Sequence, residues 1–189
     1  FSLRMVMTKI KDPETGETID LESNDEVQKY LSDVEEIMWQ RMYAPGTNFT
    51  TALHEIYLDL GSFGTAILFI GQQNDGGLLF ECRPLAECVI AESADGKIDT
   101  VFRKSDYTVR QLWQMQNAMG WTVSDKVREL YQAEKYDDPV TVIHAVYPRK
   151  EREPGREDAE NMDYASCYFE LEETHQLKMS GFPEMPYQA

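Results

Sequence analysis

The chain has 189 residues, 42% of them hydrophobic and 11% aromatic, which is typical of a globular protein with a sizeable core. Acidic residues outnumber basic ones by 34 to 18, and the formal charge of −16 disfavours a protein that grips DNA by neutralising its phosphates. No apolar run approaches the roughly 18 residues that a membrane-spanning helix needs.

The N-terminal residues 1–22 predict a short alternating strand followed by a hairpin or surface loop, because KDPETGETID is polar and rich in turn residues. The alternation places apolar side chains at Leu3, Met5 and Met7. The chain starts at Phe1 without the features of a signal peptide, so we expect a fragment of a longer protein. Ser23 and Glu26 form a capping box that begins an amphipathic helix over residues 24–42.

A second helix runs directly into an apolar strand within NFTTALHEIYLDLGSFGTAILFI, at residues 48–70. Asn48 is a good N-cap residue, and Gly61 is placed to end the helix in a left-handed conformation. The side chains at helical spacing that we expect to face inward are Phe49, Leu53, Ile56 and Leu60. The short connection between the two helices predicts that they pack antiparallel as a hairpin.

The apolar run at residues 63–70 opens the strand-forming part of the chain. A turn at QQNDGG separates it from LLFECRP, and this pair predicts a β-hairpin. Residues 86–91 and 97–104 give two further strands, separated by a turn at Gly96. We therefore expect an antiparallel sheet of about four strands, with the two preceding helices as candidates to cover one face.

Two more helices and a second hairpin follow. Thr108 and Gln111 match a capping box that begins a helix ending at Gly120, and Ser124 or Asp125 caps the next helix. The remaining segments predict a buried strand at residues 140–147, an exposed mixed-charge loop at residues 150–160, a strand at residues 164–172 that pairs with the first, and an irregular end in GFPEMPYQA.

No catalytic, cofactor-binding or metal-binding residue is predicted. His54 and Glu55 lie on the second helix, but no second histidine completes H-E-x-x-H, and neither His144 nor His175 has a ligand at metal-binding spacing. Phosphate-binding and nucleophile-elbow motifs are absent from the sequence. The carboxylate clusters Glu35–Glu36, Asp137–Asp138 and Glu170-Glu172-Glu173 are expected on a surface this acidic.

Cys82, Cys88 and Cys167 are too few and too irregularly spaced for a disulfide framework, and they lack the CxxC spacing of zinc sites. We expect them to be small buried side chains of a chain made in a reducing cytoplasm.

The run at residues 48–70 resembles the early part of the bacteriophage head-to-tail connecting protein family, the portal proteins of short-tailed, podovirus-type phages. Further matching segments follow in the same order: RPLAECVIAESADGKIDTVFRK, TVRQLWQMQ, DKVRELYQ, VTVIHAVYPRK and FPEMPYQA. Together they cover nearly the whole chain from about residue 22 onward.

The resemblance implies a structural, non-enzymatic protein of the virion that is made in the cytoplasm of the bacterial host. It implies self-association into a ring of about twelve copies at one capsid vertex. It further implies partners among capsid and scaffold proteins, terminase and tail proteins, and passage of double-stranded DNA through the ring in packaging and ejection. The long stem helices, clip and crown of such a protein would lie beyond residue 189, which leaves this chain as the wing region.

The sequence therefore predicts an α+β fold: an N-terminal helical hairpin packed on a mostly antiparallel sheet, with further helices and a β-hairpin toward the C-terminus. We expect one domain over residues 1–189, with a possible subdomain split near residues 105–139. Residues 150–160 are the candidate contact element. Two alternatives stay open: an acidic, non-catalytic adaptor domain, and an enzyme that uses scattered carboxylates together with His54.

Overall fold

A computed structural model describes residues 9–11, 18–20, 25–73, 76–153, 155–156 and 158–189. The chain is α+β, as predicted, and its strands pair antiparallel throughout. The helices are α1 (Asp25–Met42), α2 (Phe49–Phe63), α3 (Val109–Met119) and α4 (Asp125–Gln132), with single 3-10 turns η2 (Leu85–Glu87) and η3 (Ala159–Asn161). The strands are β1 (Lys9–Lys11), β2 (Thr18–Asp20), β3 (Ile67–Gln72), β4 (Leu78–Arg83), β5 (Cys88–Glu92), β6 (Ile98–Thr108), β7 (Pro139–Pro148), β8 (Tyr164–Glu170), β9 (Gln176–Phe182) and β10 (Tyr187–Gln188).

The strands form two main sheets, of order β5-β6-β7-β8-β9 and β10-β3-β4, beside a short β1–β2 ribbon. The predicted single sheet of about four strands is therefore wrong, although each of its hairpins exists. Pro84 cannot continue the β4 ladder, and η2 follows it, so the chain leaves one sheet at β4 and enters the other at β5.

The two sheets share one core where β3 and β10 pack against the centre of the five-stranded sheet. The core consists of Ile67, Phe69, Val101, Val146 and Tyr187, each at most 7% exposed. Since side chains alternate along a strand, Val101 on β6 and Val146 on β7 lie on one face of the sheet as cross-strand partners. We call this the inner face.

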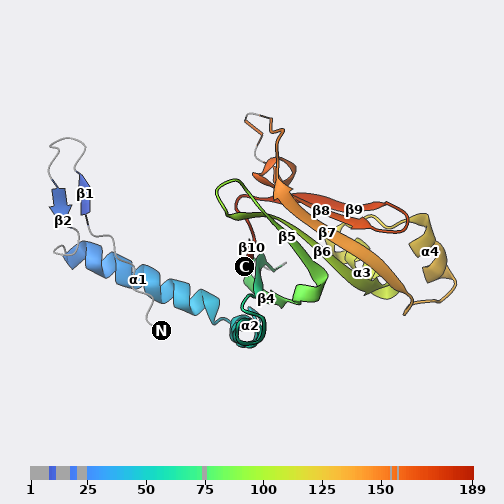
Figure 1. The fold of residues 1–189 in the computed structure, drawn as a ribbon, viewed down its shortest axis with the longest axis horizontal. Coiled ribbons are helices and arrows are strands. Elements are labelled where there is room, and N and C mark those ends of the chain that lie inside the picture. Colours follow the sequence, from blue (N-terminus) through green and yellow to red (C-terminus); the bar gives the residue numbers. More distant parts are fainter. Residues whose placement is uncertain (1–8, 12–17, 21–24, 74–75, 154, 157) are drawn as a thin grey trace.

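The same inner face is covered at its other end by α3 and α4 (Figure 1). Leu112 and Val127 from the helices are fully buried there against Val142 of β7. The predicted capping box of α3 is present, with the Gln111 amide donating to Thr108 Oγ1 and the Thr108 amide donating to Gln111 Oε1. The predicted helix ends are also confirmed, since Gly120 is left-handed and Ser124 caps α4.

The corner between α1 and α2 differs from the prediction. The two helices do not form an antiparallel hairpin: α2 is seen end-on beneath β4, whereas α1 runs across the view and away from both sheets (Figure 1). Thr47 fixes this corner, because its Oγ1 donates to the Met42 carbonyl at 2.7 Å and its own carbonyl accepts from the Phe80 amide at 2.9 Å. Only α2 therefore packs on the three-stranded sheet.

Asn48 is the N-cap residue of α2, as predicted, but the expected side-chain cap and the expected end at Gly61 are both wrong. Asn48 is left-handed, with φ 60°, and its side chain donates to the Phe80 carbonyl and does not cap the helix. The helix continues through Gly61 and ends at Gly64, whose φ of 78° suits glycine and whose amide donates to the Leu60 carbonyl. Leu60, predicted to face inward, is 45% exposed, and the buried position on this helix is Ala52.

The remaining predictions can be compared segment by segment. The helix predicted at residues 24–42 and the strand at residues 140–147 are confirmed as α1 and β7, and β8 pairs with β7 as expected. The C-terminal segment is more regular than predicted: β9 was missed, and Tyr187 of β10 pairs with Phe69. Pro183 and Pro186 precede β10 without preventing it, because the Pro186 carbonyl can still accept from the Ile70 amide.

The predicted N-terminal hairpin is present as β1 and β2. The alternating strand at Leu3, Met5 and Met7 and the capping residue Ser23 lie outside the described residues. Among the helices of the part that the structure describes, none combines the length and the apolar character required to cross a bilayer.

Candidate functional site

The most concentrated polar cluster of the inner face surrounds His144, in the middle of β7. His144 is 3% exposed, and both of its ring nitrogens have partners. Nδ1 lies 2.8 Å from the Tyr187 hydroxyl of β10, and Nε2 lies 2.9 Å from Ser166 Oγ of β8. Because β10 belongs to the three-stranded sheet, the hydrogen bond to Tyr187 joins the two sheets, whereas the one to Ser166 lies within the five-stranded sheet.

Aromatic rings complete the surroundings of His144. Its imidazole stacks on Tyr168, with ring centroids 3.9 Å apart and an interplanar angle of 4°, and the ring of Phe69 meets it edge-on. Burial, aided by the nearby Arg83 and Arg103, lowers the pKa of His144 from 6.5 to about 3. Burial also raises the pKa of Tyr187. The histidine is thus neutral at physiological pH.

The contact between Ser166 and His144 has the distance of a nucleophile–base pair, but not its chemistry. A histidine with a pKa of about 3 is a poor proton acceptor at neutral pH, and catalysis favours a base whose pKa lies near the operating pH. Ser166 is only 1% exposed, and the second nitrogen of His144 faces a tyrosine hydroxyl where a triad would have a carboxylate. The cluster is therefore suited to holding the sheets together.

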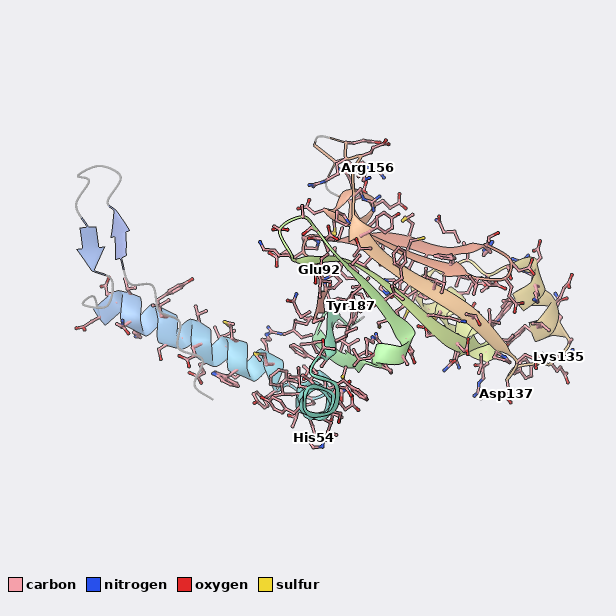
Figure 2. The ribbon with its side chains drawn as sticks, viewed as in Figure 1. His54, Glu92, Lys135, Asp137, Arg156 and Tyr187 are labelled. Atoms are coloured by element: carbon pink, nitrogen blue, oxygen red, sulfur yellow. The ribbon has the colours of Figure 1, made fainter. Side chains whose placement is uncertain are left out.

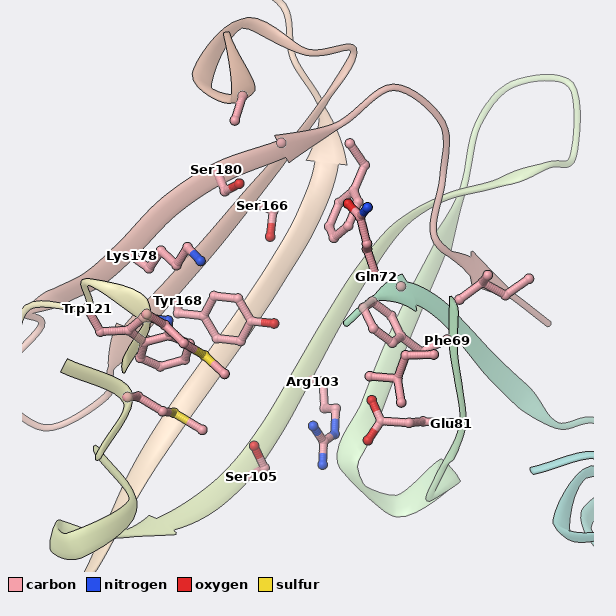
Figure 3. Close-up of a pocket in the computed structure, with 18 of the residues that line it drawn as sticks. Phe69, Gln72, Glu81, Arg103, Ser105, Trp121, Ser166, Tyr168, Lys178 and Ser180 are labelled. Atoms are coloured by element: carbon pink, nitrogen blue, oxygen red, sulfur yellow. The ribbon is translucent and has the colours of Figure 1, made fainter. Parts of the chain in front are cut away.

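Beside this joint, a cleft of about 970 Å³ opens between the two sheets and α3 (Figure 3). Arg83 and Arg103 line it, and both are paired: Arg83 with Glu81, and Arg103 Nε with Glu87 Oε2 at 2.8 Å. Arg83 also lies over the Phe69 ring, 5.1 Å from its centroid.

The other wall of the cleft carries Tyr168, Trp121 and Lys178. Two buried nitrogens in the lining, Arg83 Nε and Trp121 Nε1, have no hydrogen-bond partner among the residues that the structure describes. The cleft can accommodate water or groups that accept hydrogen bonds. Among the described side chains, no group of three or more His, Cys, Asp or Glu residues is arranged to hold a metal ion.

The residues that the sequence singled out for chemistry do not come together here. His54 is exposed on α2, on the side of that helix remote from both sheets (Figure 2). Cys82, Cys88 and Cys167 are free and half-buried, close to the expected small buried side chains. Burial, with Asp59 beside it, raises the pKa of Cys82 to about 11, so this thiol is unreactive at neutral pH.

The carboxylate clusters are also separate from the cleft. Glu172 and Glu173 pair with Lys126 at the exposed end of β8, whereas Glu170 is buried. In the mixed-charge loop, Arg156 pairs with carboxylates of the loop itself at its exposed tip (Figure 2).

Sequence reasoning missed the joint at His144. One signal was available: His144 interrupts the β-branched run of β7, and a histidine in such a buried strand needs hydrogen-bond partners. Its partners could not be found, because Ser166 and Tyr187 are 22 and 43 residues away along the chain.

The chain is similar to known phage proteins. Residues 12–189 match the family described as bacteriophage head to tail connecting protein. The chain is 32% identical over 165 residues to the probable portal protein of Bordetella phage BPP-1, covering 86% of this chain and 29% of that protein. It is 30% identical over 142 residues to the portal protein of Salmonella phage epsilon15, covering 74% of this chain and 25% of that protein. The chain thus spans less than a third of the length of these relatives.

Proposed function

Because the chain belongs to the bacteriophage head to tail connecting protein family, we propose that it is part of a portal ring at one vertex of a phage capsid. The match over residues 12–189 carries this proposal, since it includes both sheets and all four helices. In this role the complete polypeptide assembles into a ring of about twelve copies, the number that the resemblance implies for a closed cyclic assembly.

The ring admits DNA during packaging, releases it during ejection, and provides docking surfaces for terminase, scaffold and tail proteins. Within the complete polypeptide, residues 1–189 form the peripheral wing as a single domain. The formal charge of −16 is compatible with this assignment, because a peripheral wing does not need to bind DNA phosphates.

The buried chemistry is consistent with a structural role. The neutral His144, paired with Tyr187 and Ser166, stabilises the contact between sheets and offers no base at neutral pH. A rigid joint of this kind maintains the geometry of a subunit that must meet two neighbours at fixed angles.

The proposal is tested on particles made by the phage or prophage that encodes the chain. The complete polypeptide carries a short epitope in the exposed loop around Arg156, and particles opened by mild treatment are labelled with antibody-coated gold. The expected result is one labelled vertex per particle. Label spread evenly over the shell, or particles that lack the polypeptide and still package DNA, would reject the assignment.

A further inference from the structure

The outer face of the five-stranded sheet, opposite the inner face, has an apolar central row that no α-helix of the described residues covers. Register and alternation place one row of cross-strand partners on it, one residue from each strand: Val89, Phe102, Ala145, Cys167 and Met179. Ile143, Tyr147 and Phe169 lie on the same face beside this row. An antiparallel sheet face that meets water normally carries polar side chains, whereas here polar side chains such as Lys104 and Thr141 lie only beside an apolar central row.

No helix in the described part of the chain covers the outer face. The helices α3 and α4 bury Val140 and Val142 on the inner face, and α2 packs on the three-stranded sheet. Val89 is left 67% exposed and Phe102 43% exposed, side by side as cross-strand partners. Ala145 in the middle of the row is only 3% exposed, so the exposed apolar surface lies mainly at the β5–β6 end; adjoining exposed apolar side chains of this kind mark a site of protein association.

The helix α1 also leaves large apolar side chains exposed. Tyr30 and Ile37 are separated by seven residues, so they lie on one side of the helix, where they are 67% and 56% exposed. Met38 adjoins them at 38%. A helix of this length draws most of its stability from packing, yet in the described part of the chain these side chains stay largely exposed, although Leu31 beside them is buried.

The corner at the C-terminal end of α1 prevents it from folding back over its own outer face. A chain of ring contacts runs from Trp39 through Tyr43 and Phe49 to Phe80 of β4, with centroids 4.9 to 5.3 Å apart. It fixes the helix end to the three-stranded sheet, which packs against the inner face of the larger sheet, and α1 leaves the body from there (Figure 1).

From these observations we propose that α1 of one copy docks on the outer face of the five-stranded sheet of the next copy. The dimensions agree, since α1 is about 27 Å long and the apolar row is about 19 Å across five strands. Residues 25–42 carry five acidic and two basic side chains, a net of −3, and the outer face offers Lys104, which has no ion pair among the described residues, although Asp106 lies two residues further on the same face. This inference rests on the proposed ring.

The contact joins two different surfaces, so each copy offers one α1 and one outer face. A head-to-tail interface of this type produces a closed ring when the rotation between successive subunits adds up to a full turn. A pair of subunits alone leaves one α1 and one outer face without a partner. The proposal thus identifies which surfaces build the ring and gives the exposed residues of α1 a specific function.

The test uses the complete polypeptide with the photo-reactive residue p-benzoylphenylalanine at position 37, and at position 28 as the matched control. Gln28 is exposed on the opposite side of α1. Rings are assembled from mixed isotope-labelled and unlabelled copies, irradiated, digested and analysed by mass spectrometry. Cross-links from position 37 of one copy to β6, β7 and β8 peptides of another copy are expected. Their yield should be at least about fivefold that from position 28, because only one face of the helix makes the contact. Rings in which position 37 links elsewhere, or only within its own copy, would overturn the inference and leave the proposed function intact.

A second experiment does not require the photo-reactive chains to assemble. Phe102→Asp should reduce ring formation at least tenfold, whereas Met119→Asp, at 42% exposure a close match for Phe102, should not, and circular dichroism confirms that both are folded. Unchanged rings with Phe102→Asp would contradict the inference. If the unsubstituted polypeptide forms no rings at all, the proposed function itself fails.

Discussion

Lowering the pH should weaken the contact between the two sheets, because His144 must be protonated in acid. Its pKa is about 3 in the folded chain and 6.5 in the unfolded chain, so the unfolded chain binds more protons between these values. The free energy of unfolding therefore falls as the pH falls through this window. From pH 7 to pH 5 the loss is about 2 kcal/mol, because the slope rises toward 1.36 kcal/mol per pH unit once the pH is below 6.5.

The numerous carboxylates also titrate in acid, so the measurement compares variants at each pH. At pH 7, His144→Gln should lower the free energy of unfolding by about 3 kcal/mol, because it loses the stacking on Tyr168 and one of two buried hydrogen bonds. At pH 5 the gap between wild type and variant should shrink to about 1 kcal/mol, since the variant lacks the titrating group.

Urea denaturation followed by tryptophan fluorescence at pH 7 and pH 5 measures both gaps. The exposed His54 supplies the control, and His54→Gln should differ from wild type by less than about 0.5 kcal/mol at either pH. A gap for His144→Gln that stays constant to within about 0.5 kcal/mol would refute a buried, neutral His144.

Four further substitutions test the local structure by the same denaturation assay. Gly61 lies inside α2 with open space around it, so Gly61→Ala should stabilise the chain by up to about 1 kcal/mol. Gly64 has φ 78°, so Gly64→Ala should destabilise the chain by about 1 kcal/mol. If both substitutions changed the free energy of unfolding in the same direction, α2 would not end at Gly64. Thr108→Ala removes the capping box of α3 and should cost about 1 kcal/mol, and no loss would show that the cap is dispensable. Tyr187→Phe removes the hydroxyl beside His144 Nδ1 and should cost about 1 to 2 kcal/mol, and a neutral effect would show that this hydrogen bond adds nothing.

The predictions that succeeded rest on signals confined to a few neighbouring residues. The capping box joins Thr108 and Gln111, which are only three residues apart in the sequence. The β-branched run of β7 predicts a buried strand even when the strands that pair with it are unknown. Pairing of β8 with β7 followed because a polar, proline-rich loop joins two strand-like segments.

The predictions that failed depend on contacts between distant segments. Asn48 has the composition of an N-cap, but its side chain donates to the Phe80 carbonyl, 32 residues away, and its backbone turns left-handed. The division into two sheets and the addition of β10 to β3 likewise require packing that a local pattern does not contain. The apolar side of α1 was predicted correctly as a stripe, but its exposure appears only in the fold.

The most direct measurement of the central claim is electron microscopy of the purified complete polypeptide, with particle masses taken from the same sample. The account predicts closed rings of one size, about twelve copies each, as expected for a head-to-tail interface whose rotation closes. A polypeptide that remains monomeric at high concentration would contradict it.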